Sequence, residues 1–346
     1  MKTPAAVLVE TGKPLALAEL DIPTLKPGQV LVEIAFSGVC RTQILESRGY
    51  RGNDPYLPHC LGHEGSGVVR ELGQDVAKVR AGDEVILSWI TGSGADVSST
   101  MYGWGGRTVN SGAITTFSKY AVISENRLTV KPGGLPMREA AMVGCAVATG
   151  VGAVLNTARP RPGQSLAVFG TGGIGLCAVA GAAVAGCSPI IAVDIRRDML
   201  ELASMMGATH LVDATAGEPV AEVVGICPGG VDFAIEASGL PQVMLQSLTS
   251  VRARGGIAVV VGNARHNETV ALDPKELNMG KRLFGTWGGD SYPDCDYPKY
   301  AELITSGKLD LTSIASESYP LNAINDALDD MEAGRAARPL IDMASE

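Results

Sequence analysis

Residues 168–186 read VFGTGGIGLCAVAGAAVAG, an apolar start followed by closely spaced glycines and then by a stretch rich in alanine. The GxGxxG spacing between an expected strand and an expected helix is the context of a dinucleotide-binding loop. In such a loop the first glycine makes a tight turn, the second lets the backbone approach a pyrophosphate, and the last lets the helix pack on the strand. The candidate cofactor-binding residues are therefore Gly170, Gly172, Gly173, Ile174 and Gly175.

Strand and helix patterns alternate around this loop. Helical patterns occupy 173–185 and 197–207, and runs typical of buried strands occupy 166–170, 189–194, 210–213, 231–237 and 256–262. Repeated units of this kind need right-handed crossovers and build a parallel, doubly wound sheet. The expected fold class for this part of the chain is therefore α/β.

An acidic residue follows the loop at the spacing that dinucleotide sites use. Asp194 ends the second expected strand, about 20 residues after the glycines, where its carboxylate would accept hydrogen bonds from the adenosine ribose hydroxyls. This acceptor favours NAD and repels the 2′-phosphate of NADP. Arg196 and Arg197 lie close by and could bind that phosphate, so NADP is the alternative.

The composition is that of a globular protein with a small-molecule partner. A chain of 346 residues suits two domains, because single cores stop growing at roughly 250 to 300 residues. Hydrophobic residues make up 46% and charged ones 19%, as in ordinary globular α/β proteins. The net charge of −9 argues against nucleic acid or an anionic membrane as the main partner, since neither would attract such a surface.

Cysteine usage and the N-terminus predict a cytoplasmic protein. Seven cysteines at irregular spacings do not form a disulfide framework, and an odd number leaves at least one thiol unpaired. The N-terminal residues lack the apolar core of a signal peptide. Residues 166–193 are apolar for long enough to cross a bilayer, but their glycine punctuation favours a buried strand and helix, so no membrane span is expected.

The first 145 residues or so are expected to be mainly β structure, because apolar and polar residues alternate in segments such as 5–10 and 29–36. The Gly/Ser/Thr-rich segment 88–116 is longer than ordinary connections and is either a functional loop or a lobe with structure of its own. After residue 286 the chain reads as irregular, followed by a helix at 321–334 and a strand at 339–343.

Three potential metal ligands lie in the first part of the chain. Cys40 occurs in GVCRTQILESRG, His63 in LPHCLGHEGSG and Cys145 in MVGCAVATG. Taken singly, a buried cysteine or a histidine is more often structural than a ligand. A Cys-His-Cys set with an open fourth position suits catalytic zinc, because thiolates and a neutral imidazole hold the ion tetrahedrally while the open position takes an oxygen of substrate or water.

Seven motifs occur in order along the chain: GVCRT, GHEGSGVV, AGDEVI, GCAVATG, FGTGGIG, AVDI and GGVDFAIEASG. By these motifs the chain resembles the zinc-dependent alcohol dehydrogenases of the medium-chain dehydrogenase/reductase superfamily. The resemblance implies a mainly-β, GroES-like catalytic domain made of residues 1–147 and 287–346, a Rossmann NAD-binding domain at 148–286, and an active-site cleft between them. The implied reaction transfers a hydride between an alcohol and NAD, giving the aldehyde or ketone.

The resemblance also implies roles for residues near the metal. Cys40, His63 and Cys145 would ligate one catalytic zinc ion, and Glu64 would be the nearby carboxylate that can exchange with water as a ligand. Thr42 would take the proton of the substrate alcohol. Zinc would act as a Lewis acid on the bound alcohol.

Other residues match positions that contact the cofactor or the substrate. Arg41 and Arg338 resemble the arginines that bind the cofactor pyrophosphate, and Thr149 matches a residue beside the nicotinamide. Trp89 falls where the family places an aromatic residue of the substrate pocket, although an ordinary core position is an equal alternative.

The chain departs from the family pattern at three points. Gln43 stands where an aspartate commonly orients the zinc-bound histidine, and a weaker or differently tuned zinc site is expected. Leu45 replaces the histidine that ends the proton relay in many relatives, which leaves cofactor hydroxyls or His59 as the route, with a structural role for His59 as the alternative. Residues 86–120 contain no cysteine, so no structural zinc is expected.

Alternatives remain for the activity and the assembly. The substrate could be a primary or secondary alcohol or a sugar-like polyol, because a fold does not select among them. A zinc-free reductase of the same superfamily that reduces enones or quinones with NADPH is one rival, and a non-catalytic nucleotide-binding relative is another. The resemblance implies a homodimer or homotetramer that pairs through its Rossmann sheets.

Overall fold

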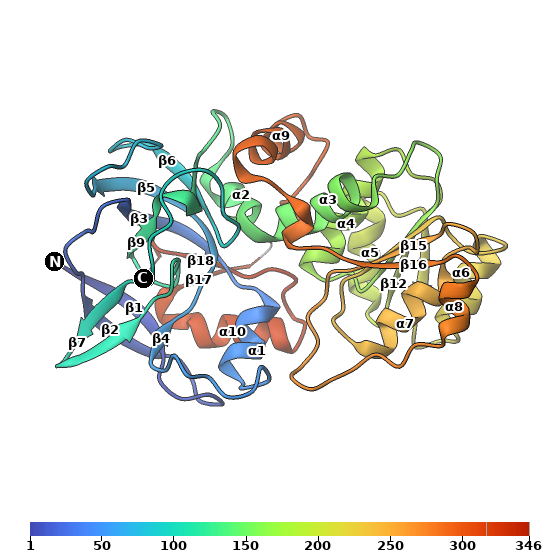
Figure 1. Ribbon diagram of the computed structural model, residues 1–346, viewed down its shortest axis with the longest axis horizontal. Coiled ribbons are helices and arrows are strands. Elements are labelled where there is room, and N and C mark those ends of the chain that lie inside the picture. The colour runs from blue at the N-terminus through green and yellow to red at the C-terminus, as the bar shows by residue number, and fades with distance from the viewer. Residues whose placement is uncertain (316, 346) are drawn as a thin grey trace. The chain divides into compact units, whose positions relative to one another are not determined.

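The computed structural model describes residues 1–315 and 317–345, and the chain divides into two compact units (Figure 1). The first unit contains Met1–Cys145, Tyr292–Thr305 and Ala315–Glu346, and the second contains Ala146–Ser291 and Ser306–Ile314. The expected boundaries at 147 and 287 therefore differ from these limits by a few residues, and 306–314 belongs to the second unit. A helical run crosses the first limit, so no change in composition marks it.

The second unit is built on a six-stranded parallel sheet in the order β13-β12-β11-β14-β15-β16. Its strands are β11 (Leu166–Phe169), β12 (Ile190–Asp194), β13 (His210–Asp213), β14 (Phe233–Glu236), β15 (Ile257–Val260) and β16 (Arg282–Gly285). The central strand β11 is buried along its whole length, as in parallel sheets that are covered on both faces. The doubly wound α/β class expected from the sequence is confirmed.

Helices connect these strands. The α-helices of the second unit are α3 (Ala148–Gly152), α4 (Gly173–Val184), α5 (Arg197–Met205), α6 (Pro219–Ile226), α7 (Pro241–Ser250) and α8 (Pro274–Asn278), with the π-helical η3 (Ala153–Ala158) and the 3-10 helix η4 (Gly288–Asp290). A proline opens α6, α7 and α8, where its missing N–H costs nothing. Gly181 lets α4 pack closely on α3, because a Cβ there would lie 3.1 Å from the Cα of Val151.

The first unit combines a closed barrel with a seven-stranded sheet. The barrel strands are β1 (Lys2–Leu8), β2 (Ala16–Asp21), β4 (His59–Cys60), β7 (Met101–Trp104) and β8 (Arg107–Asn110). The sheet strands are β3 (Gln29–Gly38), β5 (Glu64–Leu72), β6 (Glu84–Ser88), β9 (Tyr120–Ser124), β10 (Leu128–Val130), β17 (Ser318–Pro320) and β18 (Leu340–Asp342). Because β18 pairs with β3, with Leu340 opposite Gly38, the last strand of the chain reaches the interior of this sheet.

One helix of the first unit, α9, lies where the sequence predicts irregular chain. The α-helices are α1 (Arg41–Ser47), α2 (Met137–Met142), α9 (Pro293–Thr305) and α10 (Ile324–Glu332), with the 3-10 helices η1 (Glu125–Arg127) and η5 (Leu321–Ala323) and the π-helical η2 (Val143–Val147). The expectation of irregular chain after residue 286 is wrong for α9. Its internal Pro298 obscured the pattern, yet Tyr297, Tyr300 and Ala301 are buried at helical spacing.

The glycine-rich lobe between β6 and β9 has structure of its own. β7 and β8 form a hairpin whose turn residues, Gly105 and Gly106, both have positive φ, which favours glycine. The carboxylate of Glu125 accepts hydrogen bonds from the backbone N–H groups of Ala77, Lys78 and Ala95 at 2.6 to 2.9 Å. These charge-assisted hydrogen bonds tie the lobe to the loop after β5 without any cysteine.

The longest apolar helical run in the described residues is Met137–Ala158, which is long and apolar enough to cross a membrane. Within its most apolar stretch, 83% is buried inside the protein. The length and composition of this run are therefore also those of a core helix. The run 166–193, which the sequence singled out, divides into β11, α4 and β12.

Candidate metal centre and nucleotide loop

The structure brings Cys40, His63 and Cys145 together inside the first unit. One ligand atom from each residue lies within 4.8 Å of the other two. Nε2 of His63 is 3.3 Å from Sγ of Cys145, and both cysteines are buried. Two sulfur atoms and one imidazole nitrogen fit a zinc ion with one position left open.

Local backbone features present the three ligands. Cys40 precedes the first residue of α1 and follows the end of β3 after one intervening residue, Val39. Gly62, with φ of +93°, makes the turn before His63, where a side chain would collide with the backbone of Thr116. Cys145 lies in the π-helical η2, a rare wide turn that is often found at functional sites and that the sequence pattern did not reveal.

The thiols of Cys40 and Cys145 interact directly, and each shifts the pKa of the other. The hydrogen bond from Cys145, together with the positive charge of Arg338, lowers the pKa of Cys40 well below its usual value. The same hydrogen bond and burial raise the pKa of Cys145 well above its usual value. The pair therefore loses one proton readily and holds the other, which a bound divalent cation would displace. Burial lowers the pKa of His63, but hydrogen bonding to Cys40 outweighs it and the pKa is raised.

Gln43 links two of the three ligands. Its Oε1 accepts a hydrogen bond from the backbone N–H of Cys40 at 2.6 Å, and its Nε2 faces Nδ1 of His63. Because a backbone N–H can only donate, this contact fixes the orientation of the amide, and the Gln43 NH₂ group donates to Nδ1. A histidine that binds metal through Nε2 carries its hydrogen on Nδ1 and needs an acceptor there. The single oxygen of Gln43 is already used by Cys40.

Glu64 and Arg338 form a buried ion pair beside the ligands. Nε of Arg338 donates to Oε1 of Glu64 at 2.8 Å, and Nη2 donates to the same oxygen. Burial raises the pKa of Glu64 against the attraction of Arg338. Gly38 makes room for the pair, because a Cβ at residue 38 would lie 1.9 Å from Oε1. The pyrophosphate contact expected of Arg338 stays a prediction, and the metal-ligand role of Glu64 does too.

Three positions bear on the proton relay: Thr42 and Leu45 on α1, and His59 on β4. Oγ1 of Thr42 is 3.8 Å from Sγ of Cys40, and Leu45 is buried. Both ring nitrogens of His59 face acceptors, Nε2 the carboxylate of Asp54 at 2.7 Å and Nδ1 the carbonyl of Cys60 at 3.1 Å. These contacts favour the structural role of His59, since both ring nitrogens are engaged by neighbouring groups of the protein.

Arg41 lies at the first position of α1 with an exposed side chain. Trp89, directly after β6, is half-buried, and the guanidinium of Arg127 donates to its carbonyl oxygen. These positions leave the expected cofactor contact of Arg41 and the pocket role of Trp89 as predictions.

The glycine loop of the second unit connects β11 to α4 at the point where the strand order reverses. Gly170 has φ of +86°, and a Cβ at Gly175 would lie 1.9 Å from the carbonyl oxygen of Gly170. Gly172 precedes α4 with open space around its missing Cβ, while Gly173 and Ile174 form the first turn. Backbone N–H groups at such a helix start suit a phosphate, and ligands of doubly wound sheets bind at this reversal point.

Asp194 lies at the end of β12 and supports this loop. One carboxylate oxygen, Oδ2, accepts hydrogen bonds from the backbone N–H of Thr171 at 2.6 Å and from its hydroxyl at 3.0 Å, and Oδ1 accepts from the backbone N–H of Arg196. The side chain of Arg196 pairs with Asp198, and that of Arg197 pairs with Glu201. Both arginine side chains therefore form ion pairs with acidic residues of α5.

Thr149, on α3, is the other expected cofactor contact. Its side chain is buried, and among the described residues its hydroxyl has no hydrogen-bond partner. An unpaired buried hydroxyl costs free energy, so a ligand that supplied a partner would gain by binding there.

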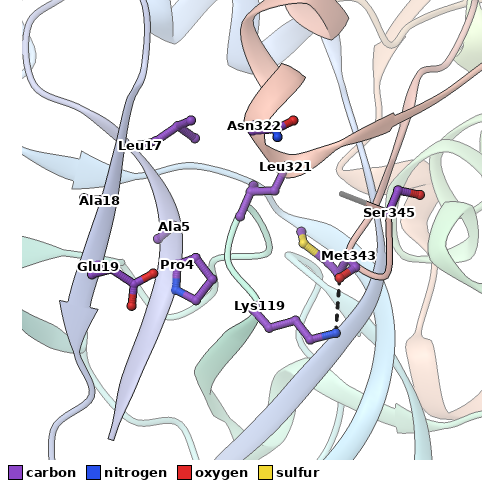
Figure 2. Close-up of a pocket in the computed structure, with 10 residues that line it drawn as sticks. All are labelled: Pro4, Ala5, Leu17, Ala18, Glu19, Lys119, Leu321, Asn322, Met343 and Ser345. Atoms are coloured by element: carbon purple, nitrogen blue, oxygen red, sulfur yellow. Dashed lines mark hydrogen bonds between the residues drawn. The ribbon is translucent and has the colours of Figure 1, made fainter.

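A cavity of about 360 Å³ lies elsewhere in the first unit (Figure 2). Its lining comes from β1, β2, Lys119, the start of η5 and the end of the chain, and it includes Leu17, Glu19, Leu321 and Met343. None of the candidate site residues lines it, so it has no part in the metal centre.

Two residues that the sequence did not single out lie beside the metal centre. Ser88 and Tyr297 are buried and hydrogen-bonded to each other, and Ser88 also bonds to the carbonyl of Gly144, the neighbour of Cys145. No motif marks them, because serine and tyrosine in a strand end and a helix read as ordinary core.

Comparisons with known proteins agree with this arrangement. The family model described as alcohol dehydrogenase GroES-like domain matches residues 26–133, and the one described as zinc-binding dehydrogenase matches residues 173–306. The chain is 33% identical to the S-(hydroxymethyl)glutathione dehydrogenase of Synechocystis sp., over 99% of this chain and 100% of that protein. It is 32% identical to the alcohol dehydrogenase class-3 of Myxine glutinosa, over 98% and 97%. The benzyl alcohol dehydrogenase structure from Acinetobacter calcoaceticus matches with a TM-score of 0.90 at 30% identity, over 99% of both chains.

Proposed function

Because the chain belongs to the zinc-dependent alcohol dehydrogenase family of the medium-chain dehydrogenase/reductase superfamily, we propose that it oxidises an alcohol to an aldehyde or ketone with NAD and one zinc ion. The observation that carries the proposal is the cluster of Cys40, His63 and Cys145, which has the donor set of a catalytic zinc site. The substrates proposed are primary or secondary alcohols, including polyols.

Each group near the metal centre has a proposed task. Zinc, when bound, supplies a Lewis acid that lowers the pKa of an alcohol. Cys40, His63 and Cys145 would hold it, and Thr42 would accept the proton that the alcohol loses while passing its own hydroxyl proton to a cofactor ribose hydroxyl. The buried pair of Glu64 and Arg338 keeps a charged carboxylate beside the site without leaving its charge uncompensated.

The second unit is proposed to hold NAD. The backbone N–H groups of Gly172 and Gly173 would bind the pyrophosphate, and Arg41 and Arg338 would be further partners. The carboxylate of Asp194 would accept hydrogen bonds from the ribose hydroxyls. Thr149 would gain a hydrogen bond to the nicotinamide end of the cofactor. NAD is preferred to NADP because a 2′-phosphate would meet the Asp194 carboxylate, while Arg196 and Arg197 are engaged with acidic side chains.

The function is tested on freshly purified protein. Elemental mass spectrometry is expected to find about one zinc per chain, and a panel of alcohols that includes benzyl alcohol and S-(hydroxymethyl)glutathione is expected to give chelator-sensitive turnover. The kcat/KM for NAD should exceed that for NADP at least about tenfold, since like charges in contact cost more than 1.4 kcal/mol. Reduction of enones by NADPH without zinc would instead identify a reductase, and tight NAD binding without turnover would identify a binding protein.

Gln43→Asp is expected to tighten zinc binding about 10- to 100-fold. Aspartate offers two oxygens, so it can accept from both Nδ1–H of His63 and the backbone N–H of Cys40, whereas the amide of Gln43 meets Nδ1 with a donor. The affinity is measured by competition with a chelator. Gln43→Asn has the same length as aspartate without its charge and serves as the matched control; equal affinities of the two variants would contradict the prediction.

We also propose that the protein is a cytoplasmic homodimer or homotetramer. The edge strand β16 of the parallel sheet has no neighbour on its outer side in the described chain. Phe284 on this strand is 42% exposed, and Trp287 just after it is 76% exposed. An uncovered edge with large apolar side chains is a natural place for strand pairing between two copies. Analytical ultracentrifugation measures the assembly directly.

A further inference from the structure

The hydroxyl of Ser88 makes every hydrogen bond available to it. It donates to the carbonyl oxygen of Gly144 at 2.6 Å, and it accepts from the hydroxyl of Tyr297 at 2.7 Å and from the backbone N–H of Ile90 at 2.9 Å. A hydroxyl has one hydrogen and two lone pairs, so no capacity is left. Ser88 is 1% exposed and Tyr297 is 0% exposed, so these hydrogen bonds form away from water.

This hydrogen-bonded hub joins three elements of the first unit that are far apart in the sequence. Ser88 ends β6, Gly144 lies in the π-helical η2, and Tyr297 lies in α9. The backbones of β6 and η2 approach closely here, because a Cβ at Gly144 would lie 2.1 Å from the carbonyl oxygen of Leu87. The next residue after Gly144 is the metal-ligand candidate Cys145.

The position of the hub gives it a specific consequence. A π-helical turn has a wider hydrogen-bonding pattern than an α-helix, and such turns are rare overall but frequent at functional sites. The turn is tied to Ser88 through the carbonyl of Gly144, which accepts the hydrogen bond from the Ser88 hydroxyl. Tyr297 donates to the same hydroxyl and so fixes its direction. A small rotation of this turn would move the sulfur of Cys145 relative to Cys40 and His63.

We propose that Ser88 and Tyr297 are positioning residues for the zinc site, which hold the η2 turn so that the sulfur of Cys145 meets the metal in the correct geometry. The inference rests on the proposed zinc-binding function. In other metal sites, loss of a residue that hydrogen-bonds to a metal ligand lowers the metal affinity about 10- to 100-fold.

The test compares the metal affinity and the metal spectrum of variants. Ser88→Ala removes all three hydrogen bonds and is expected to weaken zinc binding about 10-fold or more. Cobalt(II) replaces zinc in the same preparations, and its sulfur-to-metal charge-transfer and d–d bands are expected to shift in Ser88→Ala. Ser88→Thr keeps the hydroxyl and is expected to restore both properties. Tyr297→Phe removes a single hydroxyl and is expected to change them in the same direction by a smaller amount.

Tyr102→Phe is the matched control for a purely structural effect. Tyr102 is also a buried tyrosine of the first unit, and its hydroxyl accepts a hydrogen bond from the backbone N–H of Val122 on β9 of the seven-stranded sheet. It is expected to lower stability without moving the cobalt bands. If Ser88→Ala does not fold, Tyr297→Phe decides the question.

Two failures are distinguishable. Wild-type protein that binds no zinc would overturn the proposed function. Wild-type protein that binds zinc, with Ser88→Ala and Tyr297→Phe matching Tyr102→Phe in affinity and spectrum, would overturn the positioning role alone.

Discussion

Serine in place of Cys40 or of Cys145 is expected to weaken zinc binding on the order of 100- to 1,000-fold and to lower alcohol turnover in proportion. Four-ligand structural zinc sites bind with roughly 10 to 16 kcal/mol, which is about 2.5 to 4 kcal/mol for each ligand. A serine hydroxyl does not replace a thiolate, because its proton is not displaced by the metal at neutral pH. Zinc content after dialysis and chelator competition measure the loss.

Cys60→Ser is the matched control for both substitutions. Cys60 is also buried in the first unit, where burial raises the pKa of its thiol to about 12, but it does not belong to the cluster of Cys40, His63 and Cys145. Its zinc content and turnover are expected to stay at the wild-type level. Retention of one zinc per chain in both Cys40→Ser and Cys145→Ser would show that the metal is held elsewhere.

Replacing Arg338 with alanine is expected to lower the free energy of unfolding of the metal-free protein by about 3 to 5 kcal/mol. The substitution leaves the carboxylate of Glu64 fully buried without its positive partner. Denaturant unfolding measures the change in free energy. Hydrogen exchange of the backbone N–H groups in β3 and β5 shows that the change lies in the first unit. Arg48→Ala removes a surface arginine that also contacts two carboxylates, those of Asp329 and Glu332, and is expected to cost about 0 to 1 kcal/mol.

The loss of stability in Arg338→Ala is expected to grow as the pH rises. Burial raises the pKa of Glu64, and removal of Arg338 takes away the attraction that opposes this rise. The folded variant therefore binds more protons than its unfolded chain over the range between the two pKa values, so its stability falls as pH rises through that range. The deficit should be smaller at pH 5 than at pH 8. A deficit no larger than that of Arg48→Ala at either pH would contradict the prediction.

The parts that could be predicted from the sequence are those with local patterns. The glycine loop at 170–175 and the strands around it follow from spacing and periodicity, which are set by neighbours along the chain. The trio of Cys40, His63 and Cys145 was found through motif order, and the structure places its ligand atoms together. Spacings of 23 and 82 residues carry no geometric information by themselves, so only the order of the family motifs predicts this trio.

The parts that could not be predicted depend on pairing between distant segments. Arg338 and Glu64 are 274 residues apart, and only the addition of β18 beside β3 brings them into contact. The helix α9 was missed because Pro298 disfavours a helix locally while the burial of its tyrosines overrides that preference. The orientation of the Gln43 amide depends on a backbone N–H and a ring nitrogen that no sequence pattern describes.

The three-part construction of the first unit sets the order in which its metal centre is completed during protein synthesis. All three ligands have been made once Cys145 has left the ribosome, but Arg338 follows 193 residues later, after the whole second unit. At about 5 to 20 residues per second, this interval lasts roughly 10 to 40 seconds. For most of that interval the nascent chain also lacks α9 with the hydroxyl of Tyr297, and throughout it carries Glu64 without the arginine that neutralises the carboxylate. The metal centre is therefore finished only when the last strand of the polypeptide joins β3.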